Sequence, residues 1–322
     1  MTSFPAAEAL STPIVTLTVN PCVDESAAVD RVIPDRKLRC GSPRHEAGGG
    51  GVNVARAIRR LGGGVLAVYP AGGATGAFLE RLLAREGVPQ SRIPIGAWTR
   101  QNLNVFEEST GRQFRFVFPG PVLVEAEWEA CLARIEALHP FPRHVVGSGS
   151  LPPGVPADFY ARLAELVRSR GGRLLLDASG EGLQEALARG VFLVKPSLAE
   201  FQGLTGLRGA EESQLLRECS RLVGEGRCEV VVLSLGGAGA LMVTAEERVR
   251  WVAPTVPVRS TVGAGDSMLA GIASRLDAGA SVREAVRFGV AAAAASVMNP
   301  GTELCRCEDV QRLLPRVTSV RV

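Results

Sequence analysis

The amino-acid sequence predicts an α/β fold in which helices cover both faces of a mainly parallel sheet. Short apolar runs rich in β-branched residues, such as "IVTLTV" at 14–19 and "VFLV" at 191–194, alternate with amphipathic helical segments. Parallel strands buried on both faces have this composition, and the intervening helices supply the crossover connections. At 322 residues, the chain is long enough to bury a large core.

The expected elements follow one another along the chain, each from its local pattern. The expected strands, some with the turn that follows, lie at 14–19, 64–73, 143–150, 173–179, 191–197 and 229–239. The expected helices lie at 51–63, 76–87, 156–172, 181–190, 211–226, 281–298 and 307–317, with one more opening at Asp266. In such sheets a ligand binds beyond the carboxyl ends of the strands, where the clusters "GSGS", "GGAG" and "GAGD" fall.

Two segments without a helical pattern interrupt this alternation. Residues 25–42 and 96–118 are expected to pair into a small β lid over the active site, with "ESTGRQ" as the turn of a hairpin in the second. The main domain is then expected to comprise three segments, 13–24, 43–95 and 119–322. Residues 1–12 are expected to be a disordered tail.

Composition excludes several classes of function. A net charge of +3 and an aromatic content of 5% argue against nucleic-acid binding and against a membrane surface as partner. The first nineteen residues lack the basic and apolar regions of a secretion signal, and no apolar run is long enough to span a membrane. The seven cysteines lack zinc-site spacing. We therefore expect a cytoplasmic protein.

The stretch "STVGAGDSM" at 260–268 places glycines and an acid directly before a helical pattern. Asp266 could simply cap that helix. Alternatively, the bare amides of Gly263, Ala264 and Gly265 could hold an anion while Asp266 accepts a proton from the group that attacks it. Local sequence leaves both interpretations open.

The other glycine-rich stretches do not fit the common nucleotide loops. "GGGGVN" at 48–53 lacks the third glycine of a dinucleotide fingerprint, and neither Lys37 nor Lys195 follows a glycine as a Walker A loop requires. We interpret "GGGGVN" as backbone that approaches a ligand, with Asn53 on the first helical turn. Lys37 and Lys195 are the only two lysines among the 36 basic residues. Their retention favours a site that needs a compact ammonium group.

Three further charged residues are candidates for metal or phosphate binding because of their positions in the sequence. Glu200, just beyond a strand end, could hold Mg²⁺ directly or through water, or could complement the helix dipole; both remain open. Arg39 and Arg100 lie in the two lid segments, where they could clamp a substrate phosphate.

Together, these motifs resemble one family over residues 13–310. "GGGGVNVARAIRRLGG" and "STVGAGDSMLAGI" are similar to the two signature regions of phosphofructokinase B-type sugar kinases in the ribokinase-like superfamily. "KLRC", "PAGGATG", "WTRQNL", "GSLPPGV", "VRFGVAA" and "NPGT" are similar to its ATP-dependent 6-phosphofructokinase branch. The resemblance implies a ribokinase-like fold, ATP and a sugar phosphate as substrates, Mg²⁺ and K⁺ as cofactors, and a homodimer formed through the lid.

The resemblance also assigns roles to individual residues. Asp266 would be the general base, and the amides of Gly263, Ala264 and Gly265 would hold the transferring phosphoryl group. The implied substrate-binding residues are Asp24, Lys37 (here or from a partner's lid), Arg39, Gly48, Gly49, Asn53, Arg100 and Ser150. The implied nucleotide-binding residues are Lys195, Ser197, Ser234, Gly236 and Gly239. The implied metal-binding residues are Glu200 for Mg²⁺ and, for K⁺, Ser260, Val262, Ser296, Asn299 and Gly301.

One position departs from the family pattern, and several functions compete. Ser197 stands where the family's Asn-x-x-Glu pattern has asparagine, so weaker Mg²⁺ handling is expected. "KLRC" and the four glycines favour fructose 6-phosphate over fructose 1-phosphate or tagatose 6-phosphate. A sensor that binds these ligands without turnover is a second hypothesis. An NAD-dependent oxidoreductase would have a similar sheet but lacks its fingerprint.

Overall fold

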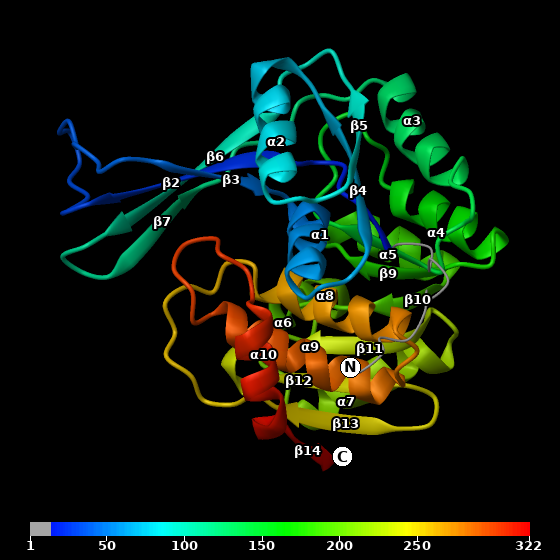
Figure 1. The fold of residues 1–322 in the computed structure, drawn as a ribbon. Coiled ribbons are helices and arrows are strands. Elements are labelled where there is room, and N and C mark those ends of the chain that lie inside the picture. The colour runs from blue at the N-terminus through cyan, green and yellow to red at the C-terminus, as the bar shows by residue number, and fades with distance from the viewer. Residues whose placement is uncertain (1–13) are drawn as a thin grey trace, which may run out of the picture.

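The computed structural model describes residues 14–322, so the tail expected at 1–12 lies outside the described residues. The described chain forms a ten-stranded sheet in the order β14-β13-β12-β11-β10-β9-β8-β1-β4-β5 and a four-stranded sheet in the order β3-β2-β6-β7. Figure 1 shows the smaller sheet projecting away from the body that contains the larger one. The predicted α/β fold with helices on both faces is confirmed.

The larger sheet is parallel over most of its width. Its strands are β1 (Ile14–Leu17), β4 (Val65–Ala71), β5 (Gln90–Pro94), β8 (His144–Ser148), β9 (Arg173–Asp177), β10 (Val191–Val194), β11 (Cys228–Ser234), β12 (Ala240–Val243), β13 (Arg248–Val252) and β14 (Thr318–Arg321). β12, β13 and β14 are antiparallel to their neighbours at one edge. The remaining strands pair in parallel, as buried apolar runs joined by helical crossovers require.

Helices pack on both faces of this sheet around two apolar cores. One core contains side chains from α1 (Gly50–Arg60), α2 (Gly73–Arg85), α8 (Ala264–Asp277), α9 (Val282–Ser296) and α10 (Cys307–Leu313). The other contains side chains from α3 (Glu125–Glu136), α4 (Phe159–Ser169), α5 (Gly180–Arg189), α6 (Leu198–Thr205) and α7 (Glu212–Gly224). Alternation along β8 explains the division, because Val146 faces the first core and Val145 the second. Two short 3₁₀ turns, η1 (Gly236–Ala238) and η2 (Leu314–Arg316), complete the helical segments.

The smaller sheet takes most of three strands from the two segments that lacked a helical pattern, and its fourth strand from residues 44–48, which were expected in the main domain. Its strands are β2 (Cys22–Val29), β3 (Arg44–Gly48), β6 (Arg100–Glu107) and β7 (Arg112–Phe116), and we call it the lid. The hairpin predicted around "ESTGRQ" is present as the antiparallel pair β6–β7. The lid strands do not coincide with the predicted segments 25–42 and 96–118, since β2 starts at Cys22 and all of β3 lies after residue 42.

Some elements were not predicted from the sequence. The antiparallel edge strands β12–β14 were not separated by the sequence pattern, and neither was α3.

In the described part of the chain, no helix is both long and apolar enough to cross a bilayer.

Candidate active site

The site lies at the carboxyl edge of the larger sheet, beside β1. This strand pairs with β4 on one side and β8 on the other, so successive connections leave it in opposite directions. A crevice opens at such a switch point. The glycines of "GGGG" let α1 begin there: a Cβ on Gly50 would collide with Ser148, and one on Gly51 would lie 2.5 Å from Thr18 Oγ1. Close packing of backbone against two strand ends is therefore one physical reason for this run.

The amino terminus of α8 meets the crevice with Gly263 as its N-cap. Its φ of 74° is the left-handed conformation that glycine adopts without strain. Ala264 and Gly265 follow in the first turn, whose amides have no acceptor inside the helix; Ala264 donates only a 3.5 Å hydrogen bond to Thr261 O. Asp266 lies inside this turn and does not cap it. The capping interpretation is therefore not what the structure shows.

The carboxylate of Asp266 is held by Asn53. Asn53 Nδ2 donates to Asp266 Oδ2 at 3.0 Å, which joins the two signature regions across 213 residues of sequence. Burial raises the pKa of Asp266 to about 7, with a smaller contribution from the negative charge of Asp177. A carboxyl with a pKa near neutrality is suited to proton transfer.

Lys195 and Asp177 form an ion pair at the same edge. Lys195 Nζ lies 3.0 Å from Asp177 Oδ2. Asp177 is the last residue of β9, and Lys195 directly follows the neighbouring strand β10. Burial is the largest single influence and opposes the charge of Lys195, but the ion pair with Asp177 together with the charges of Asp266 and Glu200 outweighs it, so the pKa of Lys195 is raised. A Cβ on Gly265 would lie 3.2 Å from Lys195 Nζ, so the ammonium group sits directly beside the first turn of α8.

Ser197 and Glu200 form a capping box at the start of α6. Glu200 Oε2 accepts a 2.7 Å hydrogen bond from Ser197 N, and Glu200 N donates to Ser197 Oγ at 3.3 Å. The structure therefore accounts for both side chains by helix capping alone. Ser234 lies beside them, bridged to Ser197, and is followed by Gly236 and Gly239 in the turn before β12.

Asp24 lies on the lid strand β2 and is buried. Its Oδ1 accepts hydrogen bonds from Asn102 Nδ2 at 2.9 Å and from Cys22 Sγ at 3.3 Å. A Cβ on Gly48 would collide with the Asp24 carboxylate, so glycine is needed at that point of β3. These contacts bring Asp24, Gly48 and the neighbouring Gly49 together at the root of the lid.

Arg100 and Ser150 line a cleft of about 720 Å³ near the lid root. Asn20 connects them, because its side-chain Nδ2 donates to Ser150 Oγ at 3.1 Å and its backbone carbonyl accepts from Arg100 Nη2 at 2.9 Å. Arg100 Nη1 also donates to Phe118 O at 2.9 Å. The guanidinium is thus fixed at the edge of the cleft.

Lys37 and Arg39 lie apart from these groups. Both are exposed on the loop between β2 and β3, at the outer end of the lid (Figure 1). Within residues 14–322, the structure gives neither side chain a hydrogen bond or ion pair with the residues around Asp266. The expected grouping of both with Arg100 in one chain is therefore not observed.

The predicted K⁺ residues meet where two loops pair. Arg259 N and Ser260 N donate to Val297 O at 2.8 and 3.3 Å, which holds the 258–262 loop against the end of α9. The Oγ of Ser296 is buried with no hydrogen-bond partner among the described residues, and Asn299 Nδ2 donates to Leu304 O at 3.0 Å. A buried hydroxyl oxygen without a hydrogen-bond partner is compatible with a cation ligand.

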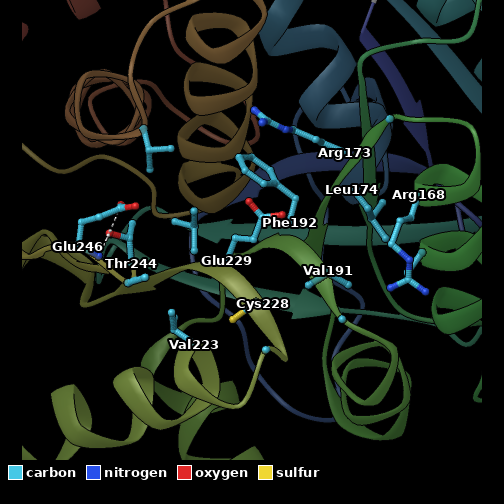
Figure 2. Close-up of a pocket in the computed structure, with 17 residues that line it drawn as sticks. Arg168, Arg173, Leu174, Val191, Phe192, Val223, Cys228, Glu229, Thr244 and Glu246 are labelled. Carbon is cyan, nitrogen blue, oxygen red and sulfur yellow. Dashed lines mark hydrogen bonds between the residues drawn. The ribbon is translucent and has the colours of Figure 1, made fainter.

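A separate cleft of about 510 Å³ opens at the opposite, amino edge of the sheet. Figure 2 shows Arg173 beside Phe192 there, with Glu229 nearby. The Arg173 guanidinium lies 4.7 Å from the centre of the Phe192 ring, and Arg168 Nη1 donates to Arg189 O. Both cations are engaged by the protein itself, and the cleft is remote from Asp266.

Sequence reasoning missed several side chains that hold the site together. Asp177 was seen only as the end of the strand "LLLD", and a carboxylate at the carboxyl end of a central strand was the available signal. Asn20 follows the strand at 14–19 and Asn102 lies within "WTRQNL", but no local pattern marks their hydrogen-bond partners. Arg56 lies inside the first signature region and was treated as an ordinary helical residue.

Sequence and structure comparisons define the class of protein. The family model for pfkB family carbohydrate kinases matches residues 17–309. The chain belongs to this family of carbohydrate kinases, as its signature regions predicted.

Within this family, the chain can be compared with individual sugar-phosphate kinases. The chain is 46% identical to the ATP-dependent 6-phosphofructokinase isozyme 2 of Mycobacterium tuberculosis, covering 93% of this chain and 88% of the relative. It is 43% identical to the isozyme 2 of Escherichia coli, with 93% and 97% covered. A 1-phosphofructokinase of Rhodobacter capsulatus is 33% identical, with 95% and 96% covered.

Solved structures give the same comparison. The E. coli phosphofructokinase-2 in complex with potassium superposes with a TM-score of 0.91 at 42% identity, covering 94% of this chain and 98% of that one. Its complex with fructose-6-phosphate and its tetrameric inhibited form each have a TM-score of 0.89 at 41% identity, with the same shares covered.

Proposed function

We propose that the protein is an ATP-dependent 6-phosphofructokinase that phosphorylates fructose 6-phosphate at its 1-hydroxyl to give fructose 1,6-bisphosphate. The observation that carries this is the carboxylate of Asp266, bound to Asn53 at 3.0 Å and set in the first turn of α8. Higher identity to the 6-phosphofructokinases than to a 1-phosphofructokinase supports the choice of sugar.

The reaction that this geometry supports is a single in-line transfer. Asp266 takes the proton of the substrate's 1-hydroxyl while that oxygen forms a bond to the γ-phosphorus of ATP. The bond between that phosphorus and the oxygen bridging to the β-phosphate breaks, and ADP leaves. The amides of Ala264 and Gly265 and the ammonium of Lys195 stabilise the charge that spreads over the transferring group.

Different parts of the crevice would bind different parts of the substrates. Asp24, Gly48, Gly49 and Asn53 would bind sugar hydroxyls at the lid root, where they converge. Arg100 and Ser150 would bind the 6-phosphate in the cleft that they line. The nucleotide would contact the loop that contains Ser234, Gly236 and Gly239, next to Ser197.

Two metal ions are part of the proposal. Glu200 would hold Mg²⁺ through water, because its carboxylate already accepts the capping hydrogen bond and Mg²⁺ keeps several waters beside nucleotide phosphates. When bound, Mg²⁺ would neutralise phosphate charge. Ser260, Val262, Ser296, Asn299 and Gly301 would hold K⁺, and a complex of the E. coli relative with potassium supports the choice of ion.

A homodimer formed through the lid completes the proposal. Phe106 and Phe116 on adjacent lid strands are 40% and 48% exposed, which is unusual for aromatic residues on a projecting sheet. A partner's lid would cover them and bring its Lys37 toward the sugar phosphate.

A coupled assay tests the function. Purified protein with Mg-ATP is assayed against fructose 6-phosphate, fructose 1-phosphate and tagatose 6-phosphate, with and without K⁺. We expect the highest kcat/KM for fructose 6-phosphate and stimulation by K⁺. A preference for fructose 1-phosphate would contradict the choice of sugar, and ligand binding without ADP release would favour the sensor hypothesis.

A further inference from the structure

Arg56 is a fully buried arginine on the first signature helix. Its side chain is 1% exposed, and it lies three residues after Asn53, on the same face of α1. Guanidinium groups are seldom buried without a function, because removing the charge from water is costly unless every donor is paired. Nothing in the reaction described above uses Arg56 directly.

Its partners surround the guanidinium on three sides. Nε and Nη2 lie 2.8 and 2.7 Å from Glu86 Oε1 at the end of α2. Nη1 donates to Ala47 O at 2.7 Å, and Nη2 lies 3.3 Å from Glu46 Oε1, both on the lid strand β3. Nη1 also donates to Asn53 Oδ1 at 3.3 Å. The planar fork is therefore fixed by two elements before it reaches Asn53.

The chemistry of this last contact determines which way the Asn53 amide points. A guanidinium only donates hydrogen bonds, so the Asn53 atom beside Nη1 must be the oxygen. The amide nitrogen then points the other way, where the Asp266 carboxylate can only accept. The opposite amide orientation would place donor against donor at one end and acceptor against acceptor at the other.

We propose that Arg56 is a positioning residue for phosphoryl transfer: it holds the Asn53 carboxamide so that its NH₂ group donates to the Asp266 carboxylate. This inference rests on the proposed function, in which Asp266 is the base. Arg56 touches neither substrate in this account and acts through Asn53.

The same side chain connects the base to the lid. Glu46 and Ala47 belong to β3, which continues directly into Gly48 and Gly49 at the sugar site. The other carboxylate oxygen of Glu46 accepts a hydrogen bond from Thr302 Oγ1, next to the expected K⁺ loop. Arg56 thus contacts the lid root and the base's partner with one rigid group, so it sets their relative position.

The electrostatic surroundings of Asp266 make this role measurable. The groups that face it are Asp177 at the end of β9, Lys195 after β10, Asp24 on β2 and Asn53 on α1. Of these, the hydrogen bond from Asn53 is the one that depends on Arg56, and it lowers the pKa of Asp266. Loss of that bond therefore raises the pKa of the base.

The test compares Arg56 variants in a protein whose Glu86 has been neutralised, so that the Arg56 charge can be removed. Removing Arg56 alone would leave Glu86 with only the more distant Arg60, at 3.7 Å. Arg56→Met is therefore made together with Glu86→Gln, and Glu86→Gln alone is the matched control. Circular dichroism, melting temperature and ATP affinity establish that each variant is folded. The Arg56→Lys variant keeps the charge but loses the fork.

We expect Glu86→Gln to lower the melting temperature while leaving kcat and the pH profile unchanged. Adding Arg56→Met should lower kcat about tenfold or more and move the acidic limb of kcat/KM to higher pH, as a misplaced catalytic contact does. Arg56→Lys should lie between the two. An unchanged pH profile in a folded Arg56→Met variant would overturn the proposal.

A double-mutant cycle supplies the second criterion. If Arg56 acts through Asn53, the Arg56 substitution in an Asn53→Ala background should change kcat by less than about twofold. A full additional tenfold loss there would show an independent role and overturn the proposal. Wild-type protein without kinase activity would instead refute the proposed function, so the two failures are distinguishable.

Discussion

Asp266 lies among two other carboxylates and one ammonium group, and its ionisation is the residue-scale property that matters most. Burial and the charge of Asp177 raise its pKa to about 7, while the Asn53 hydrogen bond and Lys195 lower it. A general base acts only when deprotonated, so activity must depend on pH near neutrality.

We predict that kcat/KM rises as pH increases through about 7 and then levels off. The measurement is a pH profile at saturating Mg-ATP, with the coupling enzymes checked at each pH. A profile already flat from pH 5 upward would mean that the base has an ordinary carboxyl pKa.

The same raised pKa predicts a stability effect. The folded state binds the Asp266 proton more tightly than the unfolded state, where the pKa is 3.8, so stability is lost as pH rises from that value through about 7. Asp266→Asn removes this cost and should raise the free energy of unfolding at pH 8 by on the order of 2–4 kcal/mol. Denaturant unfolding should show the gain at pH 8 and its disappearance toward pH 4.

At the residue scale, the predictions from sequence came from short motifs. "GAGD" and "GGGGVN" placed Asp266 and Asn53 in one site, and the two bond directly. Asp177 and Asn102 escaped notice because their partners come from other strands, and the register of those strands is a tertiary property. Arg56 was missed because its burial depends on how α2 and β3 pack against α1.

At the scale of elements, α6 begins with a capping box at the position where we propose that Mg²⁺ is held. Ser197 caps the helix through a reciprocal pair with Glu200. Serine and asparagine are equally good N-caps, whereas asparagine reaches further toward a metal-bound water. Substitution at this position therefore separates helix stability from metal handling.

We predict that Ser197→Ala lowers the free energy of unfolding by about 1 kcal/mol, because the cap is lost. Ser197→Asn should leave stability within about 0.5 kcal/mol of wild type while lowering the Mg²⁺ concentration needed for half-maximal activity. Thermal unfolding and an Mg²⁺ titration of the kinase assay measure the two effects. Equal Mg²⁺ dependence in the serine and asparagine proteins would show that position 197 has no part in metal binding.

The parallel core of the sheet was predictable because each buried strand is a continuous apolar run followed by an amphipathic helix. The antiparallel edge was not, because the described residues between β12 and β13 form no helix and β14 is exposed throughout. Such edge strands depend on the strands beside them, and the sequence pattern does not identify those neighbours.

At the scale of the whole molecule, the lid separates residues that one active site is expected to use. Arg100 lies at the lid root, whereas Lys37 lies at the outer end of the lid (Figure 1). The boundaries of the lid as a domain, and its pairing with a partner's lid, remain predictions. The sequence indicated both lid segments but could not indicate how two chains meet.

We predict that Lys37 acts across the dimer. Mixing inactive Lys37→Ala and Asp266→Asn proteins under conditions of subunit exchange should restore up to about a quarter of wild-type activity, because half of the dimers are then mixed and each holds one intact site. Covalently tagged subunits would confirm exchange. No recovery despite exchange would place Lys37 in the site of its own chain.

The central claim is that Asp266 is the base of a phosphoryl transfer, and one comparison tests it most directly. The measurement is kcat of Asp266→Asn with fructose 6-phosphate, alongside its affinity for Mg-ATP by calorimetry. We predict a fall in kcat by a factor of about 10³ or more with nearly unchanged ATP affinity. A variant that retained wild-type kcat would contradict the account.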